Sequence, residues 1–226
     1  MKFAIIVPAR KGSKTIKDKN LFKINNKSLV EYTFSQIKNL NYQKFVLSDD
    51  FRILKKALKY KINTSYQRPP ETSDSKSSMV KTLLHFVKWL KIYDDKISEL
   101  VVLQPTSPLR VKKDVINSIN IYKKKKFHSL FSISESLEHP YEAIDVKNLK
   151  NNSWKYVLKK SKMFYRRQDF DINSYFINGA IYIINIKKLE ITKSMVTKNH
   201  GLYLMNKFNS LDINDIEDIK VAKKLL

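Results

Sequence analysis

The chain has 226 residues, 42% of them hydrophobic, which is enough for one α/β domain with a sizeable core. It contains no cysteine, and this excludes disulfides, thiolate metal sites and cysteine nucleophiles. Its 44 basic residues outnumber 21 acidic residues and give a formal net charge of +23, which is typical of chains that meet a polyanion.

Short apolar runs alternate with helical patterns along the first 134 residues. In chain order they predict a strand at 3–7, a helix at 28–40, a strand at 44–48, a helix at 51–60, a strand at 62–66, a helix at 77–93, a strand at 100–104, a helix at 112–125 and a strand at 129–134. Strands separated by helices predict an α/β fold with a mainly parallel sheet covered on both faces.

The alternation stops at residues 135–175, which combine short strand-like pieces with polar turns. We interpret this segment as an insertion, either a lid or a dimerisation arm, within a single domain covering residues 1–226. Regular patterns return with strands expected at 177–184 and 202–208 and a final amphipathic helix ending at Leu226.

The loop after the first strand, PARKGSKTIKDKN at 8–20, contains four lysines and one arginine. The chain lacks the glycines of a P-loop or a dinucleotide fingerprint. Backbone N–H groups around Gly12 and Ser13, together with Arg10, Lys14 and Lys19, can still form a phosphate site. The alternative is a solvated run of charge. Ligands of such sheets bind beyond the carboxyl ends of strands, so we expect the loops at 8–20, 67–78 and 104–110 to converge on one site.

Arginine and glycine are scarce, so their positions are informative. Where charge alone suffices the chain uses lysine, and arginine should persist where a planar, bidentate donor is needed. Glycine should mark a positive φ or a close approach. These residues are Arg10, Arg52, Arg68, Arg110, Arg166 and Arg167, and Gly12, Gly179 and Gly201.

The net charge itself has two explanations. One is a basic nucleic-acid-binding domain, which predicts arginine-rich and aromatic-rich faces. The other is an A/T-biased genome, which produces the combination of lysine, asparagine and isoleucine seen in KINNKSL and KNNSWKYVLKK. We favour the second explanation because lysine is spread along the whole chain.

Five stretches together resemble the acylneuraminate cytidylyltransferase family, which makes CMP-sialic acids and related CMP-activated sugars. They occur in the family's order over essentially the whole chain: PARKGSKTIKDKN at 8–20, RPPETSDSKSS at 68–78, LQPTSPLR at 103–110, NGAIYI at 178–183 and SLDINDIEDI at 210–219. The resemblance implies a Rossmann-like nucleotidyltransferase fold, usually a homodimer in which the insertion of one subunit reaches its partner.

The resemblance also implies site residues. For CTP, Arg10 and Lys19 would hold the triphosphate with Gly12, Ser13 and Lys14 beside them, Asn20 would hold the ribose, and Arg68 and Ser78 would read the cytosine. For the sugar acid, the implied residues are Gln104, Thr106, Ser107, Arg110, Arg167 and Asn178. Asp212 would bind Mg²⁺, with Asn214 where the family commonly has a second aspartate. The alternatives are a helix N-cap for Asp212, a strand cap for Gln104 and a surface or dimer contact for Arg167.

We therefore expect transfer of CMP from CTP to the anomeric hydroxyl of a sialic-acid-like ulosonic acid, with release of pyrophosphate and with Mg²⁺ as cofactor. Alignment and charge neutralisation carry such a reaction without a protein nucleophile. The alternatives are an eight-carbon ulosonic acid or another sugar nucleotide as product, and, from another class, a basic nucleic-acid-binding domain. Met1-Lys2 leads directly into a strand, and no apolar run is long enough to cross a membrane, so we expect a cytoplasmic enzyme with no membrane or nucleic-acid partner.

Overall fold

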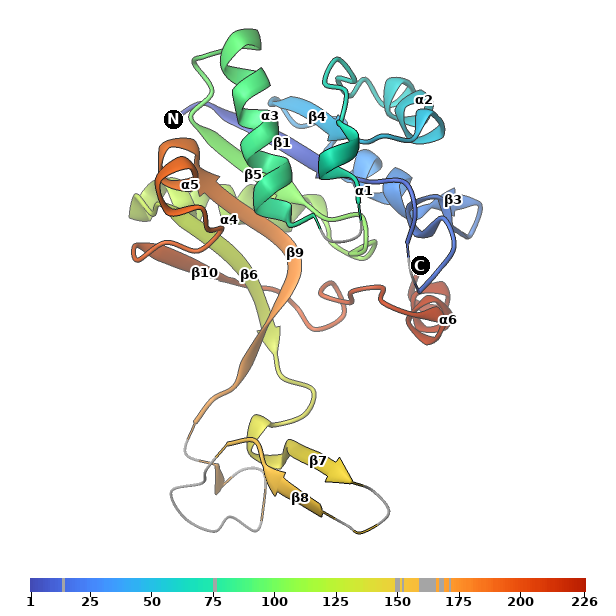
Figure 1. Cartoon of the computed structure of the whole chain (residues 1–226), viewed down its shortest axis with the longest axis vertical. Coiled ribbons are helices and arrows are strands. Elements are labelled where there is room, and N and C mark those ends of the chain that lie inside the picture. Colours follow the sequence, from blue (N-terminus) through green and yellow to red (C-terminus); the bar gives the residue numbers. More distant parts are fainter. Residues whose placement is uncertain are drawn as a thin grey trace.

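A six-stranded sheet lies at the centre of the computed structural model, in the order β10-β6-β9-β5-β1-β4 (Figure 1). The structure describes residues 1–13, 15–74, 77–148, 151, 153–158, 166, 169–170 and 172–226. The strands of this sheet are β1 (Phe3–Pro8), β4 (Gln43–Leu47), β5 (Glu99–Leu103), β6 (Ser129–Glu135), β9 (Tyr175–Asn185) and β10 (His200–Leu204). Strand β9 is antiparallel to both its neighbours and the other three pairs are parallel, which confirms the mainly parallel α/β prediction.

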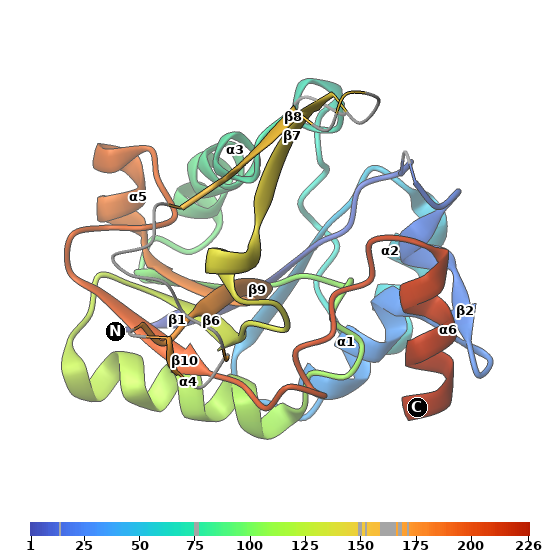
Figure 2. The ribbon, with the colours of Figure 1, turned by 90° about the horizontal axis from the view of Figure 1, so that it is seen from below.

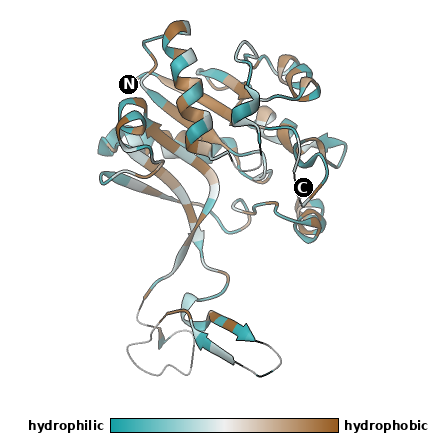
Figure 3. Cartoon of the chain, viewed as in Figure 1, coloured by the Kyte–Doolittle hydropathy of each residue, from teal (hydrophilic) through white to brown (hydrophobic). Residues whose placement is uncertain are grey.

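Helices cover both faces of the sheet. They are α1 (Leu29–Ile37), α2 (Phe51–Lys59), α3 (Met79–Tyr93), α4 (Lys112–Lys125) and α5 (Ile186–Thr192). The last helix, α6 (Ile216–Leu225), packs away from the sheet in a separate cluster with Ile16 and Ile24. Successive side chains of a strand point to opposite faces, so Ile5 and Val7 pack with α1, α2 and α4, whereas Ala4 and Ile6 pack with α3 and α5. The strands are correspondingly hydrophobic in Figure 3.

The remaining elements are short. They are the 3₁₀ turns η1 (Lys19–Leu21), η2 (Pro70–Thr72) and η3 (Pro140–Glu142) and the paired strands β2 (Lys23–Ile24) with β3 (Lys27–Ser28) and β7 (Ile144–Asn148) with β8 (Ser153–Tyr156). The β7–β8 pair lies within the segment interpreted as an insertion, and Figure 1 shows this segment projecting away from the sheet beyond the ends of β6 and β9. No helix of the described residues is long and apolar enough to span a membrane.

Several elements differ from the sequence prediction. The strand expected at 202–208 is β10, which covers His200–Leu204, and the short β2–β3 pair was not predicted. The strand expected at 62–66 is wrong, because only a single bridge joins Asn63 to Phe45 of β4. The chain turns directly afterwards, where the Ser65 amide donates to the Asn63 side chain at 2.7 Å. Helix α5 was not predicted; it begins where Asn185, at the end of β9, accepts a hydrogen bond from the amide of Lys188.

The scarce glycines lie where the sequence analysis expects them. Gly12 and Gly179 have φ of +77° and +74°. Gly201, in β10, is required for a different reason. A Cβ atom at this position would lie 2.2 Å from the ring of Phe127, which packs against the core.

We predict that Gly201→Ala lowers the free energy of unfolding by about 1–3 kcal/mol, because the Phe127 ring has to move within a packed core. Urea denaturation measures this change. The control is Leu202→Ala on the same strand, where the side chain is half exposed and the expected loss is below about 1 kcal/mol. Equal stabilities of Gly201→Ala and the wild type would show that the ring moves freely.

Candidate active site

A cavity of about 350 Å³ lies beyond the carboxyl ends of β1 and β5. The three loops predicted to converge all contribute to it. Its lining comprises Pro8, Arg10, Gly12, Ser13, Thr15, Lys19 and Asn20 from the first loop, Arg68, Ser77, Met79 and Thr82 from the second loop and the start of α3, and Gln104, Pro105 and Thr106 from the third. Three of these residues are basic and none of the described lining residues is acidic, so the cavity suits an anion.

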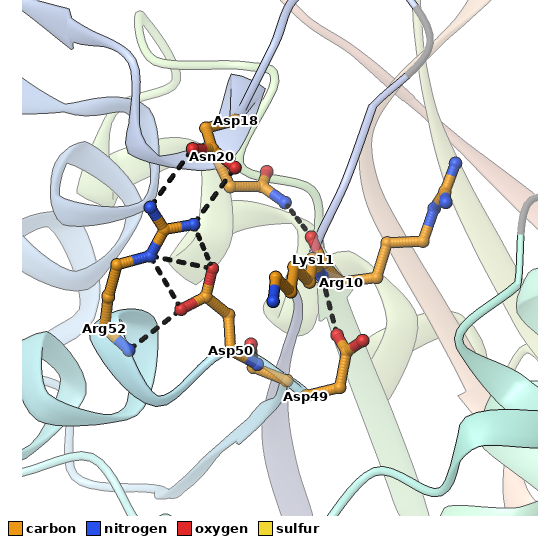
Figure 4. Close-up of polar contacts among 8 residues, drawn as sticks. Arg10, Lys11, Asp18, Asn20, Asp49, Asp50 and Arg52 are labelled. Atoms are coloured by element: carbon orange, nitrogen blue, oxygen red, sulfur yellow. Dashed lines mark hydrogen bonds and ion pairs between the residues drawn. The ribbon is translucent and has the colours of Figure 1, made fainter.

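The polar side chains of the first loop differ in how they are held. The guanidinium of Arg10 has no hydrogen bond or ion pair within the described part of the chain and extends away from the acidic residues behind the loop (Figure 4). Lys19 Nζ donates to the carbonyl of Ile213 at 2.8 Å, which ties this loop to the segment before α6. Asn20 Nδ2 donates to the carbonyl of Arg10 at 3.0 Å and so holds the two ends of the loop together. Lys14 lies outside the described residues, and its predicted role stays a prediction.

The acidic residues behind this loop were missed by the sequence analysis. Asp49 and Asp50 lie just beyond the end of β4, after Ser48, and the Asp49 carboxylate accepts a hydrogen bond from the Lys11 amide at 2.6 Å. Arg52 forms ion pairs with both Asp50 and Asp18 (Figure 4). Hydrogen bonds from Arg52 hold the pKa of Asp18 and that of Asp50 below their ordinary values. Two aspartates at the carboxyl end of a strand were a signal available in the sequence.

The second loop is held by a buried arginine. Arg68 donates through Nε and Nη2 to the carbonyl of Thr72 and through Nη2 to Thr82 Oγ1, at 3.1 Å for the latter. Burial lowers the pKa of this guanidinium, and the charge of Asp49 acts in the opposite direction. Ser78 is the N-cap of α3, where its hydroxyl accepts from the Lys81 amide at 3.1 Å. The cavity is lined by the preceding residue, Ser77, instead of Ser78.

Arg110 was predicted to help shape the wall beside the sugar acid, and the structure places it behind that wall. Its side chain is buried, and Nη1 donates to the carbonyls of Gln104 and Ala180 at 3.1 and 2.7 Å. Its Nη2 donates to Thr33 and Gln36 of α1 at 2.9 and 3.0 Å. Arg110 therefore supports the wall of the cavity from behind and does not belong to its lining. The sequence motif could not distinguish an arginine that faces a ligand from one that faces the protein.

Several polar atoms near the third loop are buried without a hydrogen-bond partner. Among the described residues they include Thr106 Oγ1, Ser107 Oγ, Asn178 Nδ2 and Asp212 Oδ1. Asn178 is held by its other side-chain atom, which accepts from Ser132 Oγ at 2.6 Å. Gly179 follows it, and a Cβ atom at this position would lie 3.7 Å from the Gln104 side chain. Unpartnered buried polar atoms are rare in proteins and are expected where a polar ligand binds.

The segment before α6 was predicted to bind metal. Asp215, and not Asp212, is the N-cap of α6, with Oδ1 accepting from the amides of Glu217 and Asp218. Asp212 Oδ2 accepts from Asn214 Nδ2 at 3.0 Å, and Oδ1 is the unpartnered atom. The N-cap alternative for Asp212 is therefore wrong.

The residues present fit only one mode of Mg²⁺ binding, in which the protein supplies few of the ligands. No cluster of three or more acidic or histidine ligands occurs within the described residues. Mg²⁺ is commonly held by one or two carboxylates together with waters and substrate phosphates, and a single unpartnered carboxylate oxygen matches that pattern.

The segment containing Asp212 is attached to two loops of the cavity. The Ile213 amide donates to the carbonyl of Thr106 at 2.8 Å, and Thr15 Oγ1 donates to the carbonyl of Asn214 at 2.8 Å. Helix α6 continues this attachment, because Ile219 packs with Ile16 and Ile24, and Figure 2 shows α6 beside β2. The final segment therefore joins the loop after β1 to the loop after β5.

The arginine pair of the insertion is described only in part. Arg166 makes an exposed ion pair with Asp169, with Nε 3.0 Å from Oδ2. Arg167 lies outside the described residues, so its contact with the sugar acid stays a prediction.

Comparison with solved structures supports the fold. The chain superimposes on CMP:2-keto-3-deoxy-manno-octonic acid synthetase complexed with CTP with a TM-score of 0.72 and 14% identity, covering 100% of this chain and 98% of that chain. A 4-diphosphocytidyl-2C-methyl-D-erythritol synthase from Anaerococcus prevotii gives a TM-score of 0.68 at 13% identity, covering 99% and 95%. At these identities the likeness shows a shared fold.

Sequence comparison goes further. Post-translational flagellin modification protein B of Campylobacter coli is 28% identical over 225 residues, covering 96% of this chain and 92% of that protein. Pseudaminic acid cytidylyltransferase of Campylobacter jejuni is 26% identical over 231 residues, covering 100% and 96%. N-acylneuraminate cytidylyltransferase of Escherichia coli is 30% identical over 223 residues, and the match covers 98% of this chain but only 51% of that protein. Residues 4–221 match the family described as Cytidylyltransferase. The chain therefore belongs to the cytidylyltransferase family of nucleotidyltransferases.

Proposed function

We propose that the chain transfers CMP from CTP to the anomeric hydroxyl of a nine-carbon, sialic-acid-like ulosonic acid and releases pyrophosphate. The observation that carries this proposal is the composition of the cavity. A basic loop forms one side, and its Arg10 guanidinium has no protein partner among the described residues. Thr106, whose buried hydroxyl is without a partner, lies on the other side, and the segment that contains Asp212 is bonded to it through the Ile213 amide. A triphosphate fits the first side, and a polyhydroxylated acid fits the second.

The names of the relatives favour this class of sugar. Two that align with nearly the whole chain are named for acylneuraminate and pseudaminic acid. The structurally similar synthetase for an eight-carbon acid keeps that substrate as the alternative. A nucleic-acid-binding role has less support, because the arginines of the described residues pair within the protein or, in the case of Arg10, face the cavity.

The reaction needs alignment more than it needs a reactive side chain. Backbone N–H groups at Gly12 and Ser13, with Arg10 and Lys19, would hold the triphosphate. The sugar hydroxyl forms a bond to the α-phosphorus, the bond to the pyrophosphate oxygen breaks, and the hydroxyl proton passes to solvent. Asp212 would hold Mg²⁺, which when bound neutralises charge on the phosphates.

We also propose that the chain forms a homodimer through the segment 135–175. Several large apolar side chains of this segment are exposed in the single chain: Ile144, Val146, Trp154, Tyr156 and Val157. Exposed apolar groups on a projecting element are typical of a protein–protein contact. A partner could then add residues to the sugar end of the site.

Pyrophosphate release with CTP, Mg²⁺ and a panel of ulosonic acids tests the proposed function. At least one nine-carbon acid should support turnover, and CTP should be preferred over UTP by about 100-fold or more in kcat/KM, because a site that hydrogen-bonds the exocyclic amine of cytosine rejects the oxygen of uracil. Turnover with the eight-carbon acid alone would select the alternative. Equal use of CTP and UTP would contradict base reading by the loop that contains Arg68.

The metal assignment predicts a second result. Asp212→Asn should reduce apparent Mg²⁺ affinity by about 10-fold or more while the melting temperature stays unchanged, because the carboxylate supports no helix. The matched control is Asp215→Asn, since asparagine is also a good N-cap and should preserve both properties. Titration of activity with Mg²⁺ measures the difference. A reduced Mg²⁺ affinity in the Asp215 variant alone would show that Asp215, and not Asp212, binds the metal.

Asn214→Asp provides a gain-of-affinity test of the same site. It adds a carboxylate beside Asp212, and the Mg²⁺ concentration for half activity should fall. An unchanged requirement would mean that position 214 does not face the metal.

A further inference from the structure

The loop between β1 and β2 is fixed from outside the cavity by the residues that follow β4. Asp49 accepts from the Lys11 amide at 2.6 Å. The Asp18 carboxylate accepts from both terminal nitrogens of Arg52, with Oδ2 3.1 Å from Nη1 and Oδ1 3.0 Å from Nη2. These contacts join two segments that are more than thirty residues apart in the chain, and Figure 4 shows the Asp18–Arg52 contact on the side of the loop away from the Arg10 guanidinium.

Arg52 is itself held in a single orientation. Its Nε lies 3.0 and 3.2 Å from the two carboxylate oxygens of Asp50, and Nη2 lies 2.6 Å from Oδ2. Asp50 is buried, and its Oδ1 also accepts from the Arg52 amide at the start of α2. One planar guanidinium thus joins two carboxylates, a geometry that lysine cannot reproduce.

The backbone of Asp18 has an uncommon conformation. Its φ is +52°, in the left-handed region that glycine adopts freely and that asparagine and aspartate adopt only occasionally, at some cost in free energy. Such a conformation persists only where the surroundings fix it. The carbonyl of Asp18 accepts from the amides of Leu21 and Phe22, so its conformation starts the turn η1, which contains Lys19 and Asn20.

The Asp18–Arg52–Asp50 network does not line the cavity, whereas the two residues that follow Asp18 do. We infer that Arg52 is a positioning residue for the nucleotide. It fixes Asp18, and Asp18 fixes the turn that directs Lys19 and Asn20 into the cavity. The inference rests on the proposed function, in which this loop holds the triphosphate and ribose of CTP.

Arg52→Lys tests the inference because it keeps the charge and removes the planar fork. The dissociation constant for CTP, measured by calorimetry, should rise about 10-fold, and KM for CTP should rise with it. KM for the sugar acid should change less than about 2-fold, because the third loop is untouched. A general loss of stability would not separate the two substrates in this way.

The matched control is Lys56→Gln, on the same helix. Lys56 pairs with Glu31 of α1 at 2.8 Å, and this ion pair has no contact with the loop. Its loss should leave CTP affinity within about 2-fold of the wild type. Asp18→Asn removes the other end of the network but retains a residue that tolerates positive φ. It should weaken CTP binding to a similar extent, and the double variant should be no worse than either single variant.

Amide hydrogen exchange supplies a readout that needs no nucleotide. In the free protein, Arg52→Lys should speed exchange within residues 11–22, and Lys56→Gln should not. Unchanged exchange and unchanged CTP affinity in Arg52→Lys would overturn the inference while wild-type turnover of CTP still supports the proposed function. If Arg52→Lys exchanges faster but the wild-type protein does not bind CTP, the proposed function is wrong. Any role of Arg52 in nucleotide positioning is then wrong as well.

Discussion

Five basic residues lie between Arg10 and Lys19, and a loop of this composition has to hold its shape although like charges repel. Contacts with other parts of the chain make this possible. The Lys19 ammonium donates to the carbonyl of Ile213, and the backbone amide of Lys11 donates to Asp49. Arg52 of α2 pairs with Asp18 of the loop. The Arg10 guanidinium keeps no protein partner among the described residues. The loop is thus fixed at its ends, with charge left over for a ligand.

The sheet supplies the rest of the geometry. Strands β1 and β5 are parallel neighbours, so the loops that follow them emerge side by side. Arg110 then connects the β5 loop to β9 and to α1 through its two terminal nitrogens. The segment before α6 closes the arrangement by binding both loops. Residues from distant parts of the chain therefore reach one cavity, and hydrogen bonds join the loops that carry them.

Local patterns predicted most of the fold. The capping box at Ser28–Glu31, the apolar strands and the alternation of elements needed only short-range information, and the structure has them. The strand at 62–66 failed because β propensity alone cannot show whether a neighbouring strand is available. The sequence predicted correctly which three loops form the cavity. It predicted less well which side chains of these loops line it, because Ser78 and Arg110 do not. The scarcity of arginine correctly indicated that Arg52, Arg68 and Arg110 use the planar guanidinium as a multiple donor. Their acceptors in the structure are protein atoms. The sequence could not show this, because the identity of an acceptor depends on tertiary packing.

We propose that the basic loop and the Asp212 segment act on the same nucleotide, the loop by holding the triphosphate and Asp212 by holding Mg²⁺. A crystal structure of the chain with CTP and Mg²⁺ tests this proposal. We expect the triphosphate against Arg10, the amides of Gly12 and Ser13, and Lys19, with Asp212 among the ligands of the metal. A nucleotide bound elsewhere, or phosphates in this cavity with Asp212 remote from the metal, would contradict it.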